Sequence, residues 1–300
     1  MLKRKLFRIF ETVGVLAASA LLIIYPRESS AAAANALDTC IRTLIPSLFP
    51  FFVLSGIMRL PEKFAAPLTS RLFRVGGACA APILTGLVSG YPVGAASAVS
   101  LYREGRCSKD EAERLIAFCN NAGPAFIFGV VGVSVFKSSR AALLLYVVNA
   151  IVSLTVGAVL GTGHRAAYSP PSSPSRAPGF TASVKTAVSS VLNVSAFVIF
   201  FAVYIKLAGM YIHFSSPILE SLLTGFVELS SGLMSLDGFT PLNAALASAM
   251  LGWGGISVHC QVLSFTSDTD LSLKRYFLAR LAHGVLCACV TYTICKIMWK

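Results

Sequence analysis

Long apolar segments recur along the whole chain, and they constrain its fold more than any other feature. A helix needs about 20 apolar residues to cross the roughly 30 Å hydrocarbon core of a bilayer. The segments that approach this length are 6–25, 36–58, 78–101, 115–136, 141–160, 184–207, 217–236, 242–265 and 276–299. In lipid the backbone must bond within its own segment. We therefore predict an all-α polytopic membrane protein with about seven to nine transmembrane segments.

Composition and charge support a lipid bilayer as the surroundings and exclude nucleic acid as a partner. Of the 300 residues 55% are hydrophobic and only 13% are charged, whereas soluble domains carry about 25% charged residues. The net charge of +12 comes from short basic clusters between apolar runs. That pattern is typical of cytoplasmic loops, whereas a nucleic-acid face would be continuous and interleaved with exposed aromatics.

The N-terminus allows two interpretations. A basic stretch, an apolar run and the alanines at 32–36 together match a cleavable signal peptide. Residues 6–25 are nevertheless long enough to span a membrane. We favour a retained N-terminal transmembrane helix within residues 1–35, with a cytoplasmic N-terminus, and cleavage stays open.

A polar linker divides the rest of the chain into two membrane halves. Residues 163–183 are rich in proline and serine, which is typical of a flexible connection. The first half is 36–162 and the second is 184–300. Two echoes relate them: 90–94 (GYPVG) with 252–255 (GWGG), and 84–88 (LTGLV) with 223–227 (LTGFV). The echoes imply different offsets, so they do not establish a duplication, but broken apolar segments in two halves are typical of a transporter's binding site.

Charge placement predicts that two apolar segments turn back inside the membrane. If the N-terminus is cytoplasmic, the basic loops 59–74 and 102–114 are both cytoplasmic only if 78–101 enters and leaves on one side. A re-entrant hairpin bent at 90–92 satisfies this, and the same logic gives a hairpin for 242–265. A kinked spanning helix remains the alternative for each.

The strongest candidate site is the segment 85–95. Pro92 disfavours helix at Tyr91, and Gly90 and Gly94 permit unusual backbone dihedrals. A helix that restarts near Pro92 would aim free N–H groups inward at an anion, so these residues and Ser89 are predicted to bind substrate. Close helix packing through Gly90 and Gly94 is the alternative.

A second candidate lies in the middle of the segment 115–136. Asn120 and Asn121 are two adjacent amides in a membrane segment, where polar groups are costly without partners. Gly123, followed by proline, breaks the helix at the same depth. We predict that these three residues contact a substrate or an ion.

A third candidate is a carboxylate, Glu228, inside the apolar segment 217–236. An ionisable residue at this depth is a functional hypothesis by default. Glu228 is predicted to carry a proton or an ion, and Ser230 and Ser231 beside it are predicted to bind substrate.

The fourth candidate follows a second glycine break, Gly254 and Gly255. Ser257, His259 and Gln261 alternate with apolar residues, so an extended stretch would place all three on one side. The two glycines, Ser257 and Gln261 are predicted to bind substrate and His259 to carry a proton or an ion. A purely structural hydrogen-bonding histidine is the alternative.

Enzymatic motifs and cofactor signatures are absent from the sequence. It contains no HExxH, GxSxG, P-loop or GxGxxG pattern, and its eight cysteines show no zinc spacing. We therefore expect no enzymatic activity, no cofactor and no metal.

Four segments of the chain resemble those of YlbJ-type sporulation integral membrane proteins, which belong to the wider nucleoside-recognition, or Gate, domain group. They are 84–95 (LTGLVSGYPVGA), 119–124 (CNNAGP), the segment around Glu228, and 254–261 (GGISVHCQ). The likeness runs from about residue 36 to the C-terminus and keeps the motifs in order. The SGYPxGA element is its most diagnostic part.

The resemblance implies a secondary transporter in the cell membrane or outer forespore membrane of a spore-forming bacterium. Family members are similar to concentrative nucleoside carriers and are associated with moving dipicolinic acid out of the mother cell. The implied partner is therefore a small-molecule anion. A nucleoside-type carrier and a non-transporting scaffold for spore cortex or envelope assembly stay open, as does a homo-oligomer.

Overall fold

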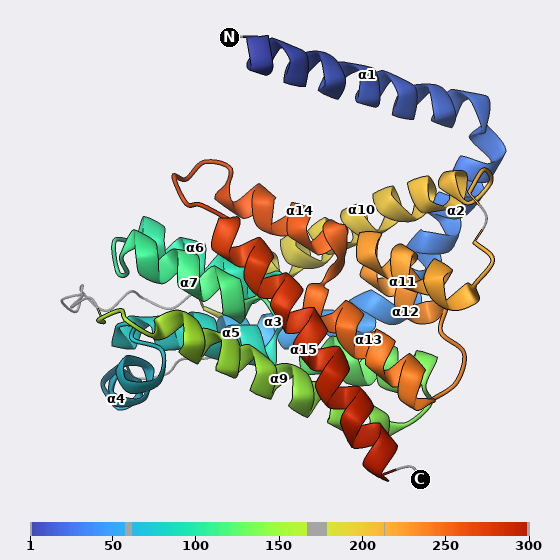
Figure 1. Cartoon of the computed structure of the whole chain (residues 1–300). Helices are drawn as coiled ribbons and strands as arrows, with labels where there is room; N and C mark the ends of the chain where they lie inside the picture. The colour runs from blue at the N-terminus through green and yellow to red at the C-terminus, as the bar shows by residue number, and fades with distance from the viewer. Residues whose placement is uncertain (1, 58–61, 167–178, 213, 299–300) are drawn as a thin grey trace.

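Helices make up the regular structure of the described part of the chain, residues 2–57, 62–166, 179–212 and 214–298 of a computed structural model (Figure 1). No strand occurs within these ranges. In chain order the helices are α1 (Leu2–Ile24), α2 (Pro26–Thr39), η1 (Cys40–Leu44), α3 (Ile45–Ile57), α4 (Glu62–Leu72), η2 (Gly77–Cys79), α5 (Ala80–Val88), α6 (Val93–Arg103), α7 (Lys109–Cys119), α8 (Pro124–Phe126), η3 (Ile127–Val135), α9 (Ser139–Gly161), α10 (Phe180–Ala208), α11 (Pro217–Val227), α12 (Leu229–Met234), α13 (Pro241–Trp253), α14 (Gly255–Thr266) and α15 (Lys274–Met298).

Six stretches within the described residues are long and apolar enough to cross a membrane. They are Pro26–Ile57, Lys109–Val135, Ser139–Gly161, Phe180–Ala208, Pro241–Thr266 and Lys274–Met298. Each coincides with a predicted apolar segment. A seventh is counted if Phe64–Leu72 and Gly77–Val88, which meet at 90°, form one broken span. The predicted class, an all-α polytopic membrane protein, is confirmed.

Prolines and side-chain caps set where several helices begin. Pro124, Pro217 and Pro241 each occupy the first turn of a helix, where a missing N–H costs nothing. Ser108 and Glu111 form a capping box at the start of α7, in which each side chain bonds the backbone N–H of the other. Local sequence therefore fixes these helix starts.

α5 and α6 form a helical hairpin, so the chain reverses direction where the sequence predicts a reversal within 78–101. They reverse between residues 88 and 93, and a Cβ built on Gly94 would lie 2.7 Å from the Cα of Gly86. The segments flanking the hairpin lie on one face, because the buried Arg114 donates to the carbonyls of Phe73 (2.8 Å) and Arg74 (3.0 Å). The two basic loops thus share a side.

α11 and α12 form a second hairpin, where the sequence predicts a spanning segment. The chain reverses at Glu228, and a Cβ built on Gly232 would lie 2.1 Å from the Cα of Gly225. Farther from the tip, the hydroxyls of Ser221 and Ser235 are hydrogen-bonded at 2.8 Å. Small residues on both helices allow this antiparallel contact, which is why the segment folds back.

The hairpin that charge placement predicts for 242–265 is wrong. α13 and α14 continue as one candidate span, Pro241–Thr266, interrupted at Gly254. The φ of Gly254 is +95°, a left-handed conformation that ends α13 and that glycine adopts without steric cost. The chain bends there, and the reversal has already taken place at Glu228.

Each half is therefore built from a hairpin followed by a broken span. In the first half α7 ends at Cys119 and α8 begins at Pro124; in the second the break is at Gly254. The echo of 84–88 with 223–227 marks equivalent places, because each stretch ends the first helix of a hairpin. The echo of 90–94 with 252–255 instead relates a hairpin tip to a broken span.

One face of the bundle carries the loops between α4 and α5, α6 and α7, and α14 and α15; we call it the basic-loop face. Arg103 pairs with Asp268, and Lys109 Nζ lies 2.9 Å from Asp270 Oδ2. These pairs are exposed, so each contributes at most about 1 kcal/mol. These pairs show that the loop between α6 and α7 lies beside the loop between α14 and α15.

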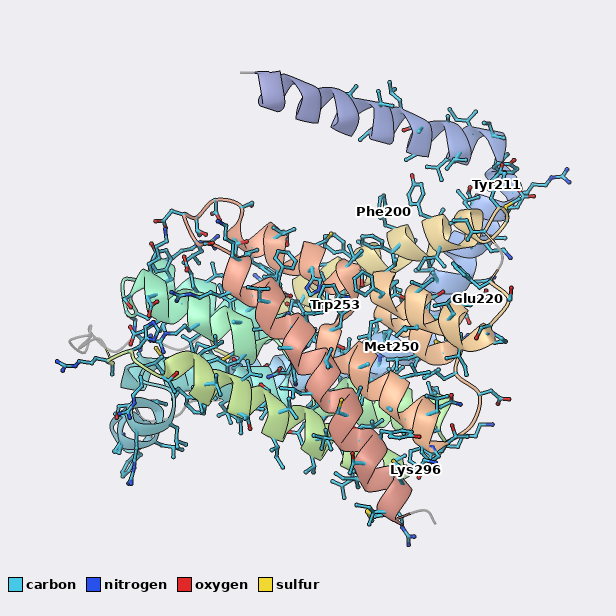
Figure 2. All side chains as sticks on the ribbon, in the orientation of Figure 1. Phe200, Tyr211, Glu220, Met250, Trp253 and Lys296 are labelled. Carbon is cyan, nitrogen blue, oxygen red and sulfur yellow. The ribbon has the colours of Figure 1, made fainter. Side chains whose placement is uncertain are left out.

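α1 stands away from the rest of the bundle and joins it through α2 (Figure 1 and Figure 2). The described apolar part, Thr12–Ile24, is shorter than a membrane span. That this helix spans the membrane stays a prediction. So does the domain division at 163–183, of which 167–178 lie outside the described residues.

Candidate functional site

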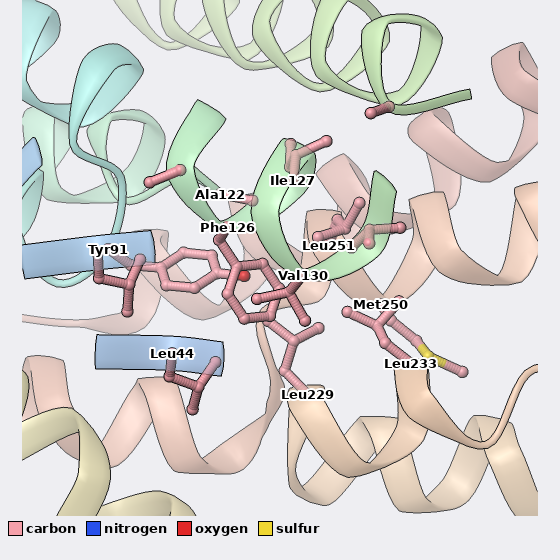
Figure 3. Close-up of a cluster of buried hydrophobic side chains, with 14 of the residues drawn as sticks. Leu44, Tyr91, Ala122, Phe126, Ile127, Val130, Leu229, Leu233, Met250 and Leu251 are labelled. Atoms are coloured by element: carbon pink, nitrogen blue, oxygen red, sulfur yellow. The ribbon is translucent and has the colours of Figure 1, made fainter. Parts of the chain in front are cut away.

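The two hairpin tips and the two broken spans meet in the middle of the bundle (Figure 3). Tyr91 from the first tip and Leu229 from the second lie near Phe126, which follows the first break. The Tyr91 and Phe126 rings are 6.0 Å apart between centroids. α10 packs on α2 and α3, and α15 packs on α7, α9 and α13. Helices of both halves therefore enclose this centre.

In the first half, backbone contacts fix the hairpin tip to the break. The N–H of Tyr91 donates to the carbonyl of Asn121 at 2.6 Å. A Cβ built on Gly90, whose φ is +80°, would lie 2.2 Å from the N of Gly123. No other residue fits at Gly90 without moving one of the two segments.

In the second half, Glu228 is buried at the hairpin tip, with 1% of its surface exposed. Its Oε1 accepts from the N–H of Ser230 at 3.0 Å and its Oε2 from the N–H of Ser231 at 2.7 Å. A carboxylate is stabilised at a helix N-terminus by these N–H groups and by the helix dipole. Glu228 thus caps α12 at the depth of the site.

A small closed cavity of about 20 Å³ lies between the tips. That volume holds one water molecule, not an organic solute. The predicted site residues on its wall are Ser89, Tyr91, Gly123, Glu228, Ser230, Ser257 and Gln261. Four separate sequence segments thus contribute to one place, and the site has a closed form.

Several predicted site residues carry buried polar atoms that have no hydrogen-bond partner among the described residues. These atoms are Ser89 Oγ, Tyr91 OH, Asn120 Oδ1, His259 Nε2 and Gln261 Oε1. An unpaired buried polar group costs about 1–3 kcal/mol, and folded proteins pair nearly all of theirs. Five further atoms of this kind belong to Asn149, Ser183, Ser195 and Arg280. The five at the hairpin tips and breaks lie where a polar solute would meet both halves of the chain.

Asn120 and His259 meet through a residue that sequence reasoning missed, Tyr276. Asn120 Nδ2 donates to the Tyr276 hydroxyl at 3.1 Å, and His259 Nδ1 lies 2.7 Å from the same oxygen. The hydroxyl proton is then free to bond Nδ1, which makes Nε2 of the neutral ring an N–H donor. Tyr276 begins an apolar segment, so from sequence it resembles an interfacial tyrosine.

Asn121 faces away from the cavity and binds a second missed residue, Arg280. Asn121 Nδ2 donates to Ser153 Oγ at 2.8 Å, and its Oδ1 accepts from Arg280 Nη1 at 3.1 Å. Arg280 is 1% exposed and also donates to the carbonyl of Gly252. It therefore ties the first break to the end of α13. The sequence carries little signal for this role, because Arg280 lies near the start of the apolar segment 276–299, where a basic residue is ordinary.

The remaining predicted residues shape the backbone around the cavity. Pro92 precedes the first residue of α6, and Gly94 packs on the carbonyl of Cys119. Gly254 separates α13 from α14, and Gly255 faces the backbone of the second hairpin tip. Ser231 lines a larger cavity described below. The contacts of Gly94 are therefore those of close helix packing, which was the alternative to substrate binding for this residue.

Metal binding has no visible basis in the described part of the chain. No group of three or more His, Cys, Asp or Glu side chains that could hold an ion occurs there. The absence of a cofactor and of enzymatic activity stays a prediction.

Two hairpins, two broken spans and a small cavity between them, lined by both polar and apolar side chains, define the class. The chain is a polytopic helical membrane protein whose two helical hairpins meet in the middle of the bundle.

The chain is similar to the sporulation integral membrane protein YlbJ of Bacillus subtilis (strain 168). The two are 29% identical over an alignment that covers 94% of this chain and 80% of that protein. The similarity supports a YlbJ-type family assignment. No family model matches the chain, and no solved structure is significantly similar.

Proposed function

We propose that the chain is a secondary transporter that moves a small organic anion, dipicolinate, across the outer forespore membrane during sporulation. The solute would bind in the central cavity, between the hairpin tips of the two halves. The observation that carries the proposal is the group of buried, unpartnered polar atoms on that cavity's wall, Ser89 Oγ, Tyr91 OH and Gln261 Oε1. A scaffold that only packs helices gains nothing from leaving them unpaired.

The helix arrangement suits an anionic solute. α6 and α14 begin at the first tip and the second break, and neither has a side-chain cap. Their positive dipole ends, and the first-turn N–H groups that have no backbone acceptor, attract carboxylates; in α6 the N–H of Gly94 is already bonded to the carbonyl of Gly90. Ser89 and Ser257 add hydroxyl donors on the cavity wall. Dipicolinate is a flat aromatic dianion, which pairs with such donors better than with an apolar pocket.

Glu228 sets a condition on anion transport. Its carboxylate lies on the same wall as the donors, and like charges in a buried site repel strongly. A dianion would bind when Glu228 is protonated, which couples the solute to a proton. This is the role that the sequence predicts for Glu228, with His259 as the second candidate.

The closed cavity requires the hairpins to move. A volume of about 20 Å³ excludes any organic solute, so the tips must separate to admit one. Transporters built from repeats open alternately on the two sides of a fixed site. Within each hairpin the two helices are held together by close glycine contacts. We therefore expect each hairpin to move as one unit.

A nucleoside-type carrier is the second candidate, and one observation favours it. The cavity wall carries Glu228 and Gln261 as acceptors, and no lysine or arginine lies on it. Ribose hydroxyls would bond such acceptors directly, without a proton on Glu228.

The test is dipicolinate in spores of cells that carry single variants in place of the natural gene. Ser257→Ala removes a hydroxyl from the cavity wall, and Ser264→Ala makes the same change at an exposed position of α14. We expect Ser257→Ala to lower spore dipicolinate severalfold at normal protein abundance, because a lost hydrogen bond is worth about 1 kcal/mol. Equal dipicolinate in the two variants would refute the proposed site.

We also propose an orientation. The basic-loop face would lie in the mother-cell cytoplasm together with the N-terminus, because cytoplasmic loops carry excess lysine and arginine.

A further inference from the structure

A second, larger cavity of about 600 Å³ opens between α2, α10 and α12. Cavities of 300–1,000 Å³ are the size that small-molecule sites occupy. Its space comes from the alanine-rich part of α2, where Ala31, Ala32 and Ala36 line the wall. Ala32 and Ala36 belong to the stretch 32–36 that resembles a cleavage site in the sequence; here they form one side of a cavity.

The cavity runs from one end of the helix bundle toward the closed site. Arg27 lies in the first turn of α2 and Lys206 in the last turn of α10, so both stand at the end away from the basic-loop face. Ser230 and Ser231, at the inner end, are the residues whose N–H groups bond Glu228. Ser230 also lines the closed cavity, so one serine lies between the two spaces.

The charged residues on this wall are Arg27, Lys206 and Glu28. Neither cation forms an ion pair or hydrogen bond with another residue of the described ranges. Glu28 lies in the first turn of α2, where a carboxylate stabilises the helix dipole. Two unpaired cations with amide and hydroxyl groups of Asn35 and the serines suit a small carboxylate.

We infer that this cavity is an anion-binding vestibule, in which Arg27 and Lys206 hold a small carboxylate that passes between the outside and the closed site by way of Ser230 and Ser231. This inference rests on the proposed function and adds a second binding site and a route. The vestibule opens on the face opposite the basic loops. Glu228 occupies the N–H groups at its inner end until a substrate carboxylate replaces it.

The experiment uses the full chain in sealed proteoliposomes, in a background where the exposed Cys289 is serine. Ala32→Cys places a thiol on the vestibule wall, and Ser215→Cys places one in the exposed loop after α10 at the same face. We expect a membrane-impermeant maleimide to modify both from the same side. Dipicolinate should slow modification of Ala32→Cys and leave Ser215→Cys unchanged.

The second part of the experiment removes the two cations, Arg27 and Lys206. With Arg27→Gln and Lys206→Gln together, we expect the dipicolinate concentration that gives half protection to rise about tenfold, or ~1.4 kcal/mol. High salt should have the same effect in the unsubstituted vestibule, since exposed charges are screened. Protection that persists unchanged without both cations would overturn the inference.

Other outcomes separate this inference from the proposed substrate. If no small carboxylate protects Ala32→Cys, the vestibule site is wrong, whatever dipicolinate transport shows. If acetate or benzoate slows modification of Ala32→Cys and dipicolinate does not, the vestibule binds anions but dipicolinate is not the substrate. Modification of Ala32→Cys only from the basic-loop side would refute the route.

Discussion

The hairpins depend on glycine pairs in direct contact, which gives a strong test of the fold. In Gly94→Ala the new Cβ would lie 2.0 Å from the carbonyl oxygen of Cys119 and 2.7 Å from the Cα of Gly86. In Gly232→Ala it would lie 2.1 Å from the Cα of Gly225. These neighbours are backbone atoms, so no side-chain rotation relieves the overlap. Carbon atoms approach to about 3.5 Å, so the helices must separate by more than about 1 Å.

Separating packed helices by that amount is costly. Overpacked sites typically lose 1–3 kcal/mol, and a backbone clash belongs to the upper end or above, so we expect about 3 kcal/mol for each variant. Gly209→Ala is the control, because a Cβ there meets its nearest atom at an ordinary 3.4 Å. The assay is thermal unfolding of the detergent-purified protein, with transport measured in parallel.

We expect Gly94→Ala and Gly232→Ala to lower the melting temperature by several degrees and Gly209→Ala to leave it within one or two. Equal losses in the two hairpins would support their equivalence in the two halves. If the melting temperature of either hairpin variant equals that of the parent protein, the close helix contacts described above are wrong for that hairpin.

Three further predictions follow from single residues. Arg280→Leu leaves the buried acceptors that the guanidinium binds without a donor, so we expect about 2–4 kcal/mol lower stability; unchanged unfolding would contradict this role. Gly254→Ala forces a left-handed conformation on a residue with a Cβ, and we expect a loss of about 1–2 kcal/mol in unfolding. Hydrogen bonds from Tyr102, and then from Lys109, lower the pKa of the exposed Asp270. Its contribution to stability is therefore present above its unfolded pKa of about 4 and is lost as the pH falls through the lower folded value. Asp270→Asn should flatten the dependence of the melting temperature on pH between about 5 and 3.

Apolar segment length predicted most of the fold. The six long apolar stretches lie where segment length places them, because a bilayer fixes the length of a crossing helix. The first hairpin was predictable because two basic loops must share one side, and Arg114 shows that they do. For the second half the same reasoning placed the hairpin in the wrong segment. Gly254 breaks a helix without reversing it, and the reversal depends on a tertiary contact between Gly225 and Gly232.

The candidate site was partly predictable, for a physical reason. Polar residues in apolar segments must find partners or a solute, so Ser89, Glu228 and Gln261 stand out in the sequence and share one cavity wall. Arg280 and Tyr276 did not stand out, because each lies near a segment end, where charged and aromatic residues are ordinary. Only the packing of α15 against both halves reveals that they are buried.

Solute uptake by the purified protein tests the central claim most directly. Proteoliposomes preloaded with unlabelled dipicolinate would be placed in medium with labelled dipicolinate, and accumulated label would be compared with that of protein-free liposomes. We predict saturable accumulation that is reduced severalfold by Ser257→Ala and kept by Ser264→Ala. Uptake equal to that of protein-free liposomes, from protein that unfolds cooperatively at its normal temperature, would contradict a transporter of dipicolinate.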